Sequence, residues 1–290
     1  MEKFTGKQKG ILLMCTSALL FSGMQIAIRL TGGTIPLMEQ VFFRNIVSLI
    51  ISFFIILKSN GSYFGGKKHQ PLLFTRSVMG MLGLVSLFYA SANAYQADVT
   101  ILSRLSPFLI TLWAFLFLKE KIAKVQVPAL ILAFAGAAFV VNPTLNSNIF
   151  PLFLALLCSF FTSVSYTILS YFKNKVDPIT VVMHFSAFCV AVSLPFMFFD
   201  FVMPSLIEFL LLMLIGLLGG FGQFSLTYAY RMAPAAEVSI YNYSGILFST
   251  ILAYFILNET ISNTTVLGGV LVVIASYLVY RFSGRHAEAI

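Results

Sequence analysis

Two stretches of this chain place side chains that bind anions or form hydrogen bonds inside otherwise apolar segments. One lies at residues 103–106 and contains an arginine, and the other lies at residues 241–244. An arginine near the centre of a bilayer costs about 2.5–3.5 kcal/mol to insert, so it usually faces protein or water. A guanidinium group binds a carboxylate or phosphate through two parallel hydrogen bonds. We therefore predict a two-sided anion-binding site, formed by Arg104, Ser103, Ser106, Tyr241, Asn242 and Ser244.

Each stretch also has a structural interpretation. Arg104 could instead hold its helix in place by pairing with backbone carbonyls or with Asp98. The polar stretch could serve interhelix packing, which membrane helices often achieve through small and polar residues. In both interpretations these surfaces face protein and not lipid.

Other polar and aromatic side chains inside apolar segments are weaker candidates for substrate binding. They are Gln25, Tyr89, Asn93, Trp113, Tyr166, Gln223 and Tyr228. His184 and Glu237 are candidates for proton coupling, because an unperturbed histidine titrates near neutral pH. The simpler interpretation is packing for His184 and a favourable interaction with a helix N-terminus for Glu237.

Three further charged residues in apolar segments are predicted to be structural. Glu39 lies five residues before Arg44, and we expect the two to form an ion pair. Arg76 lies close to the end of its segment, so we expect its side chain to extend to the membrane surface. The three histidines and three cysteines show no ligand spacing, so neither a metal nor another cofactor is expected. The chain also lacks GxxxxGK[ST], the phosphate-binding signature of ATP-driven proteins.

The elements that carry these residues are predicted to be membrane-spanning helices. Of the 290 residues 59% are hydrophobic and 10% are charged, and the mean hydropathy is +0.94. Soluble domains carry roughly 25% charged residues. Ten segments have the length of about 20 residues that spans a bilayer. They lie near 9–29, 36–57, 71–94, 98–118, 125–141, 148–170, 178–199, 206–230, 234–257 and 263–281.

The distribution of lysine and arginine predicts the orientation of these helices. If the N-terminus is cytoplasmic, 14 of the 18 basic residues fall at the cytoplasmic side. Cytoplasmic loops of membrane proteins carry such an excess. We therefore predict that both termini are cytoplasmic, and we assign the net charge of +8 to topology and not to nucleic-acid binding.

A short pattern occurs twice, as TLWAFLFLKEKI at 111–122 and TILAYFILNETI at 250–261, an offset of 250 − 111 = 139. Each copy lies on the fourth segment of a group of five. Because five is odd, the two groups must enter the membrane in opposite senses, as in inverted-repeat transporters. We predict repeats at 1–141 and 148–282. Glu120 and Glu259 occupy equivalent positions and are expected to accept hydrogen bonds from the start of the following helix.

Ten segments, the inverted repeat and the FLKEKI/ILNETI pair resemble the EamA-type drug/metabolite transporter superfamily. Phe42-Phe43-Arg44-Asn45, Thr75-Arg76 and Leu105-Ser106-Pro107 add to the resemblance, although Ile246 stands where the family often has proline in the ninth span. The resemblance implies a central cavity lined by the first, third, fourth, sixth, eighth and ninth helices, with the fifth and tenth at the periphery. It also implies alternating access by rocking of the two repeats.

We therefore expect an all-α membrane protein that is a transporter and not an enzyme. The predicted function is secondary transport or exchange of small organic metabolites that bear carboxylates, such as amino acids or organic acids. The alternatives are export of drugs or lipophilic cations and exchange of nucleotide sugars. The expected partners are a small-molecule substrate, the lipid bilayer, and a coupling proton or counter-substrate. We expect a monomer in the plasma or inner membrane that does not bind nucleic acid.

Overall fold

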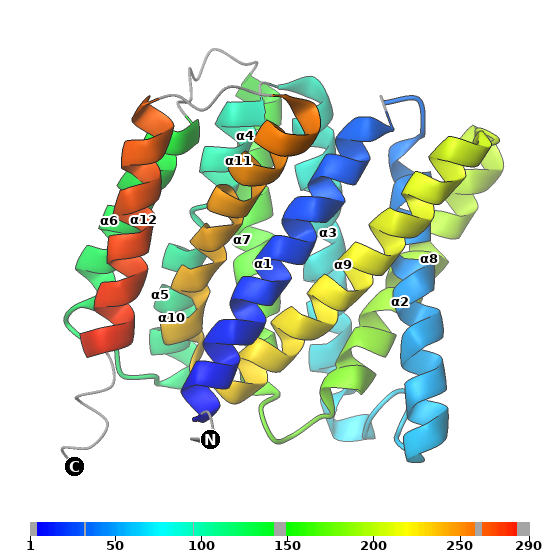
Figure 1. The fold of residues 1–290 in the computed structure, drawn as a ribbon. Coiled ribbons are helices and arrows are strands. Elements are labelled where there is room, and N and C mark those ends of the chain that lie inside the picture. The colour runs from blue at the N-terminus through cyan, green and yellow to red at the C-terminus, as the bar shows by residue number, and fades with distance from the viewer. Residues whose placement is uncertain (1–4, 32, 95, 142–148, 259–262, 283–290) are drawn as a thin grey trace.

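The computed structural model describes residues 5–31, 33–94, 96–141, 149–258 and 263–282, and all regular elements within these ranges are helical (Figure 1). The helices are α1 (Gly6–Leu30), α2 (Leu37–Ser59), η1 (Lys67–His69), α3 (Gln70–Asn93), α4 (Gln96–Ser103), α5 (Ser106–Leu118), α6 (Gln126–Val141), α7 (Ile149–Tyr171), α8 (Pro178–Asp200), α9 (Leu206–Met232), α10 (Ala235–Val238), η2 (Ser239–Tyr243), α11 (Ser244–Leu257) and α12 (Asn263–Phe282). The helices η1 and η2 are 3-10 helices.

Within the described residues, nine segments of 20–27 residues are long and apolar enough to cross a membrane. Three of them are composite, since η1 and α3 form one, α4 and α5 form another, and α10, η2 and α11 form a third. The remaining predicted segment, 125–141, corresponds to α6, which is shorter at 16 residues. The prediction of an all-helical, multi-pass membrane protein is confirmed.

Local sequence signals explain several helix ends. Thr5 and Ser205 open α1 and α9 with capping boxes, in which a side chain three residues later bonds back to the cap. Lys119 and Asn258 end α5 and α11 in the left-handed conformation, each with φ near 55°. These two residues are related by the repeat offset, since 258 − 119 = 139. The repeat therefore extends from sequence to backbone conformation.

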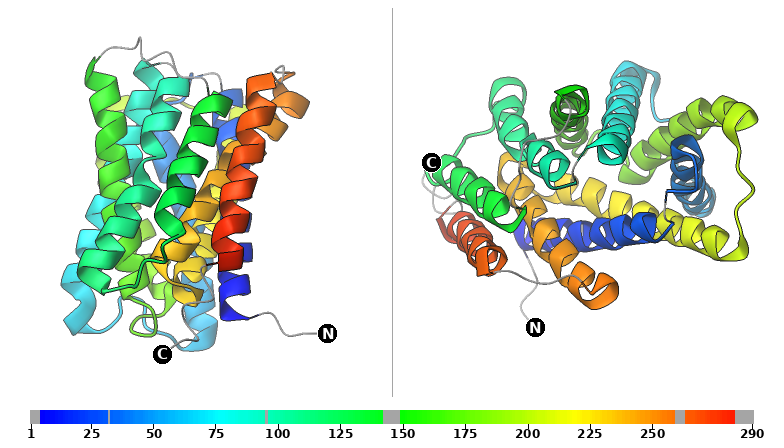
Figure 2. Two further views of the ribbon diagram at one scale, coloured as in Figure 1. Left: turned by 90° about the vertical axis from the view of Figure 1, so that its left-hand side faces the viewer. Right: turned by 90° about the horizontal axis from the view of Figure 1, so that it is seen from above.

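The two halves of the chain pack against each other through equivalent pairs of helices. The most extensive contacts join α1 to α9, α3 to α7, α6 to α12 and α2 to α8. The first helix of each half thus packs on the third helix of the other half, and the second and fifth helices pair with their own equivalents. Viewed along the bundle, α6 and α12 lie together at one edge, while α2 and α8 lie at the other (Figure 2).

Close backbone contact holds the α6–α12 pair together. A Cβ atom on Gly136 would lie 2.7 Å from the carbonyl oxygen of Gly268, so neither position has room for a side chain. Glycine and other small residues allow membrane helices to approach in this way. The pair therefore depends on van der Waals contact between backbones.

Figure 1 places the start of α1 and the end of α12 at the same end of the bundle. We call this the terminal end and the other the opposite end. Its location in the cytoplasm stays a prediction that rests on the distribution of lysine and arginine.

Candidate substrate-binding site

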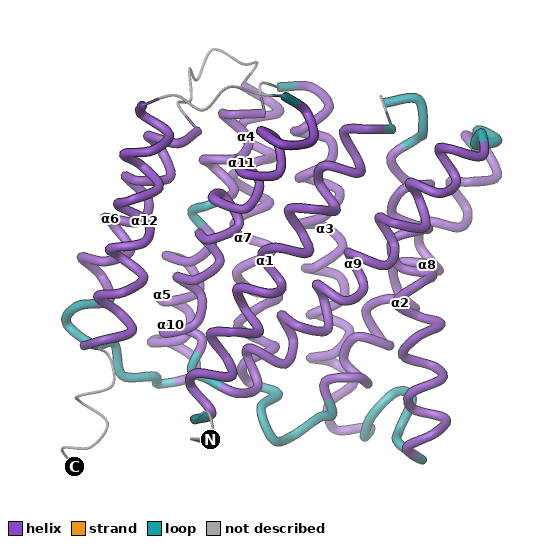
Figure 3. The backbone as a smooth tube through the Cα atoms, in the orientation of Figure 1, coloured by secondary structure: helices purple, strands orange, loops and turns teal. Residues whose placement is uncertain are grey.

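The fourth helix of each half is interrupted at equivalent residues. In the first half α4 ends at Ser103 and α5 begins at Ser106, and the break appears as a loop in Figure 3. In the second half the tighter 3-10 segment η2 separates α10 from α11. Pro107 lies in the first turn of α5, whereas Ile246 occupies the equivalent position, so the second break forms without a proline. Interrupted membrane helices commonly surround the substrate sites of transporters.

The two breaks are bonded directly to each other. The Arg104 guanidinium donates through Nη1 to the carbonyl of Asn242 at 3.1 Å. The Tyr243 hydroxyl donates to the carbonyl of Arg104 at 2.8 Å. Broken helices leave carbonyl groups without intrahelical partners, and these two bonds satisfy one carbonyl on each side. Arg104 and Tyr243 are themselves repeat equivalents, since 243 − 104 = 139.

Arg104 makes the kind of bond that its structural interpretation expects, and its role as an anion anchor stays a prediction. One nitrogen pairs with a backbone carbonyl, as the structural interpretation expects. Its Nε atom is buried and has no hydrogen-bond partner. Asp98, the other partner considered, lies outside the residues whose side chains the structure describes.

Arg76 is buried, and the expectation that it reaches the membrane surface is wrong. Its side chain is 1% exposed, and the guanidinium carbon lies 3.9 Å from the centre of the Phe185 ring of α8. Phe185 fits there because residue 80 is glycine, where a Cβ atom would lie 2.8 Å from the ring. Nε and Nη1 of Arg76 have no hydrogen-bond partner.

Arg44 is also buried, and the predicted ion pair with Glu39 does not form. The Glu39 carboxylate instead accepts the backbone N–H of Val202 at 3.2 Å, while Arg44 Nη1 lies 3.4 Å from the Asn45 side-chain oxygen. Five residues correspond to about 500° of helix, which leaves the two side chains about 140° apart. Arg44 packs instead against Gly219 of α9 and over the Phe21 ring of α1.

These three arginines lie within electrostatic range of Tyr166 of α7. Each guanidinium group lies close enough to the tyrosine hydroxyl for a Coulombic interaction, and Arg44 and Arg76 interact in the same way with each other. None of the three forms an ion pair with a carboxylate among the described residues. We call Arg44, Arg76 and Arg104 together the arginine cluster. It concentrates positive charge inside an apolar bundle, where the low dielectric strengthens any interaction with an anion.

Several residues predicted for the site use their side chains elsewhere. The Tyr241 hydroxyl donates to the carbonyl of Ser276 in α12 at 3.2 Å. Ser244 donates to the carbonyl of Tyr241 at 2.6 Å, and Ser103 donates to that of Thr100 at 2.9 Å. Asn242 contributes its backbone carbonyl, and Ser106 is buried at the start of α5.

The weaker candidates are dispersed. Trp113 donates to Ser163 of α7 at 3.0 Å, which joins the two helices. Gln223 is buried in α9 and bonds to Thr227, and Gln25 is half-buried in α1. Tyr228 interacts electrostatically with Asp177 and Arg231, near the terminal end. Tyr166, in contrast, interacts electrostatically with all three arginines of the cluster.

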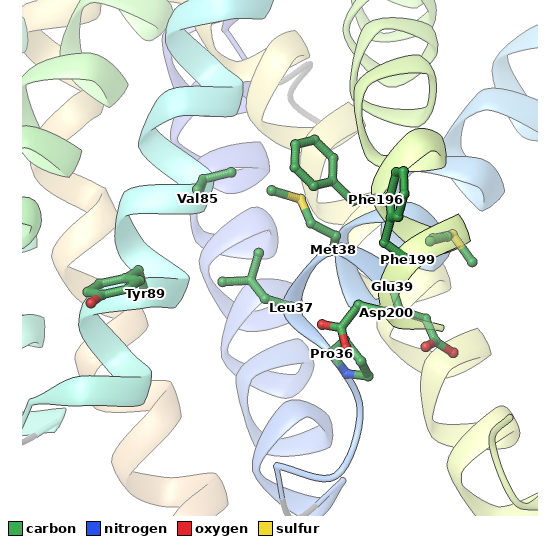
Figure 4. A pocket seen from close by; sticks show the side chains of 10 residues that line it. Pro36, Leu37, Met38, Glu39, Val85, Tyr89, Phe196, Phe199 and Asp200 are labelled. Atoms are coloured by element: carbon green, nitrogen blue, oxygen red, sulfur yellow. The ribbon is translucent and has the colours of Figure 1, made fainter. Parts of the chain in front are cut away.

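A surface cavity of about 290 Å³ lies at the opposite end, between the start of α2 and the ends of α3 and α8 (Figure 4). Tyr89, Glu39 and Asp200 line it together with apolar side chains, and Asn93 lies exposed on the next turn of α3. The arginines of the cluster are not among its lining residues. Its walls offer carboxylates and hydrocarbon, so it does not provide the anion site that the sequence predicts.

The two candidates for proton coupling have defined partners. His184 Nδ1 lies 2.9 Å from the Ser77 hydroxyl, on the residue after Arg76. Glu237 forms an ion pair with Lys7 at 3.0 Å, which joins α10 to the start of α1. Either role in coupling stays a prediction.

Glu120 caps a helix, but not the helix that we predicted. Its carboxylate accepts the backbone N–H groups of Ala235 and Ala236 at 3.1 and 3.0 Å, and also bonds Ser170. The capped helix is α10 of the other half, and not the following helix α6. Glu259, its repeat equivalent, lies outside the described residues.

The internal repeat of the sequence contains a signal for Tyr243. Extending the repeat upstream aligns Val99 with Val238 and Ile101 with Ile240, and it aligns Arg104 with Tyr243. No comparable signal identified the burial of Arg76, because that depends on how Phe185 packs against α3.

Nine membrane-length segments and the shorter α6, in two halves that pack as equivalents around interrupted helices, form the arrangement expected of an inverted-repeat transporter. The model of the EamA-like transporter family matches residues 8–142 and 149–281, so the chain belongs to this family. It is therefore a multi-pass integral membrane protein and not an enzyme.

Characterised relatives differ in what they carry. The chain is 30% identical to a pseudopaline exporter of Pseudomonas aeruginosa, with 94% of this chain and 96% of the relative covered. It is 26% identical to an S-adenosylmethionine uptake transporter of Rickettsia prowazekii, with 86% and 85% covered. A crystal structure of a protein has a similar fold, with a TM-score of 0.83 over 97% of this chain and 99% of that chain. The sequence identity is 18%, so this likeness shows the fold alone.

Proposed function

We propose that this transporter is a secondary carrier or exchanger for small organic metabolites that bear carboxylates. The observation that carries the proposal is Arg104, whose guanidinium group lies at the junction of the two interrupted helices. A carboxylate there would pair with an arginine that already contacts both halves. Substrate binding and the relative position of the halves would then be coupled.

Alternating access follows from the same contacts. Arg104 belongs to the first half, and its bonding partners Asn242 and Tyr243 belong to the second. If the halves rock, these two bonds must break or shift. A substrate that competes for the guanidinium group therefore favours one arrangement over the other, which is how a ligand shifts a conformational equilibrium.

The charge of the site argues against the alternative of a lipophilic cation. The buried Arg44 and Arg76 and the half-buried Arg104, which have no carboxylate partner among the described residues, would repel a cationic drug. The relatives include one exporter and one uptake transporter. Pseudopaline and S-adenosylmethionine are accordingly included as probes of both substrate and direction.

The proposal is tested with the full chain purified and reconstituted in liposomes. We expect saturable counterflow of at least one labelled carboxylate from a panel of amino acids, organic acids and the two named compounds. Flux that rises linearly with concentration and never saturates would reject a carrier. Arg104→Ala is expected to abolish binding and counterflow, while Arg281→Gln, at the exposed end of α12, serves as the matched control.

A further inference from the structure

Each member of the arginine cluster retains bonding capacity that the described residues do not use. Nε of Arg44, Nε and Nη1 of Arg76, and Nε of Arg104 are buried without a hydrogen-bond partner. Arg76 is 1% exposed and Arg44 is 6% exposed. Buried polar groups are nearly always satisfied, and a buried charge without a partner is more costly still. These four atoms belong to three arginines within electrostatic range of Tyr166, and anionic oxygens would supply the acceptors that they lack.

Aromatic rings hold these guanidinium groups in place. Phe185 covers one face of Arg76, and Phe21 lies 5.9 Å from the guanidinium carbon of Arg44. Such stacking stabilises the cation and leaves the edge of the guanidinium plane, which carries the N–H groups, available for a ligand. The two arginines come from α2 and α3, whereas Arg104 comes from the break between α4 and α5.

A single carboxylate does not match this arrangement. One carboxylate carries one negative charge and binds one guanidinium group in a bidentate manner. With one such group bound, most of the positive charge of the cluster would stay buried without compensation. A ligand with several anionic groups at separate positions would compensate more of that charge.

We propose that the substrate is an organic anion with at least two carboxylate groups, one bound by Arg104 and another by Arg44 and Arg76 beside Tyr166. This inference rests on the proposed function and narrows it to polycarboxylates. Arg44 and Arg76 thereby become residues that determine specificity, although the sequence alone suggested structural roles for both. Tyr166 would add a neutral hydrogen bond between the two carboxylates.

The test compares each dicarboxylate with its half-amide, which has the same length and shape but one carboxylate fewer. Succinate and succinamate, and glutarate and glutaramate, compete in counterflow against the labelled carboxylate that the wild-type protein transports best. Citrate and an organic phosphate, glycerol 3-phosphate, complete the panel. We expect at least one dicarboxylate or citrate to compete at least tenfold more strongly than the half-amides.

Variants then assign the second carboxylate to its arginines. In Arg44→Gln and Arg76→Gln we expect the dicarboxylate to lose its advantage, while weak competition by the half-amide stays unchanged. Arg281→Gln should retain the full advantage. If either cluster variant fails to fold in a thermal-shift assay, the comparison in the wild-type protein still decides the proposal.

Three results would overturn the inference. Equal competition by dicarboxylate and half-amide would show that one carboxylate suffices, and the proposed carboxylate carrier would stand without the narrower claim. Competition by glycerol 3-phosphate alone would replace carboxylates with phosphates. Saturable transport of solutes that carry no carboxylate, with no competition from any acid, would reject the proposed function as well.

Discussion

Replacing Glu120 should loosen the terminal end of the bundle, where this residue of the first half caps a helix of the second. The carboxylate accepts two backbone N–H groups of α10 and contacts Ser170 of α7. A hydrogen bond to a charged group contributes about 1.5–3 kcal/mol. Because Glu120 is only half-buried, water will satisfy part of what is lost, and we expect Glu120→Ala to cost about 2–3 kcal/mol of unfolding free energy.

A thermal-shift assay on the purified full chain measures this effect. A loss of 1 kcal/mol lowers the melting temperature by about 2–4 °C in chains of 150–250 residues, so we expect a decrease of about 4–12 °C. Glu120→Gln retains one acceptor oxygen and should fall between the wild type and Glu120→Ala.

Asp177→Ala is the matched control, because Asp177 caps α8 through a single N–H, that of Ile179 at 2.9 Å. Loss of an ordinary cap costs about 0.5–2 kcal/mol. Glu120→Ala should therefore be the more destabilising of the two. A melting temperature for Glu120→Ala equal to that of Asp177→Ala or higher would refute the reasoning. It would show that the Glu120 contact between the halves contributes no more stability than a cap within one helix.

Three further substitutions test other contacts. Gly268→Leu should separate α6 from α12, because a side chain there meets the backbone of Gly136; a loss of about 1–3 kcal/mol is expected, and an unchanged melting temperature would contradict the close packing. A double-mutant cycle on the half-buried pair of Lys7 and Glu237 should give a coupling of only about 0.2–1 kcal/mol that weakens with salt, and a coupling that salt leaves unchanged would contradict an ion pair that solvent reaches in part. Tyr243→Phe removes the hydroxyl bond to the Arg104 carbonyl and should lower stability by about 1–3 kcal/mol in the thermal-shift assay, whereas wild-type stability would show that this carbonyl has another partner.

The helices of this protein could be predicted closely from sequence. Apolar segments of membrane length, separated by short polar loops, leave little freedom in where a helix begins and ends. The repeated pattern that contains Glu120 and Glu259 also identified the fourth helices of the two halves as equivalent elements. These signals are local or periodic, which is why they are visible in a single sequence.

The candidate site was predictable only in part. Arg104 was identified because an arginine in the middle of an apolar segment is costly wherever the helix packs. The environments of Arg44 and Arg76 depend on which helices pack against them, and position along the segment does not contain that information. Glu39 and Arg44 illustrate this, because proximity along the chain suggested a pair that helix geometry separates.

The distribution of the cluster between the halves has an electrical consequence. Arg44, Arg76 and Arg104 all belong to the first half, whereas Tyr166 and Tyr243 belong to the second. In a rocking carrier, fixed positive charges would move with one half through part of the membrane field, where each elementary charge contributes about 2.3 kcal/mol per 100 mV for a complete crossing. A polycarboxylate would neutralise that charge, so membrane voltage would act mainly on the empty carrier during its return. Net transport by such a protein would therefore depend on the membrane voltage even when the substrate concentration is equal on both sides of the membrane.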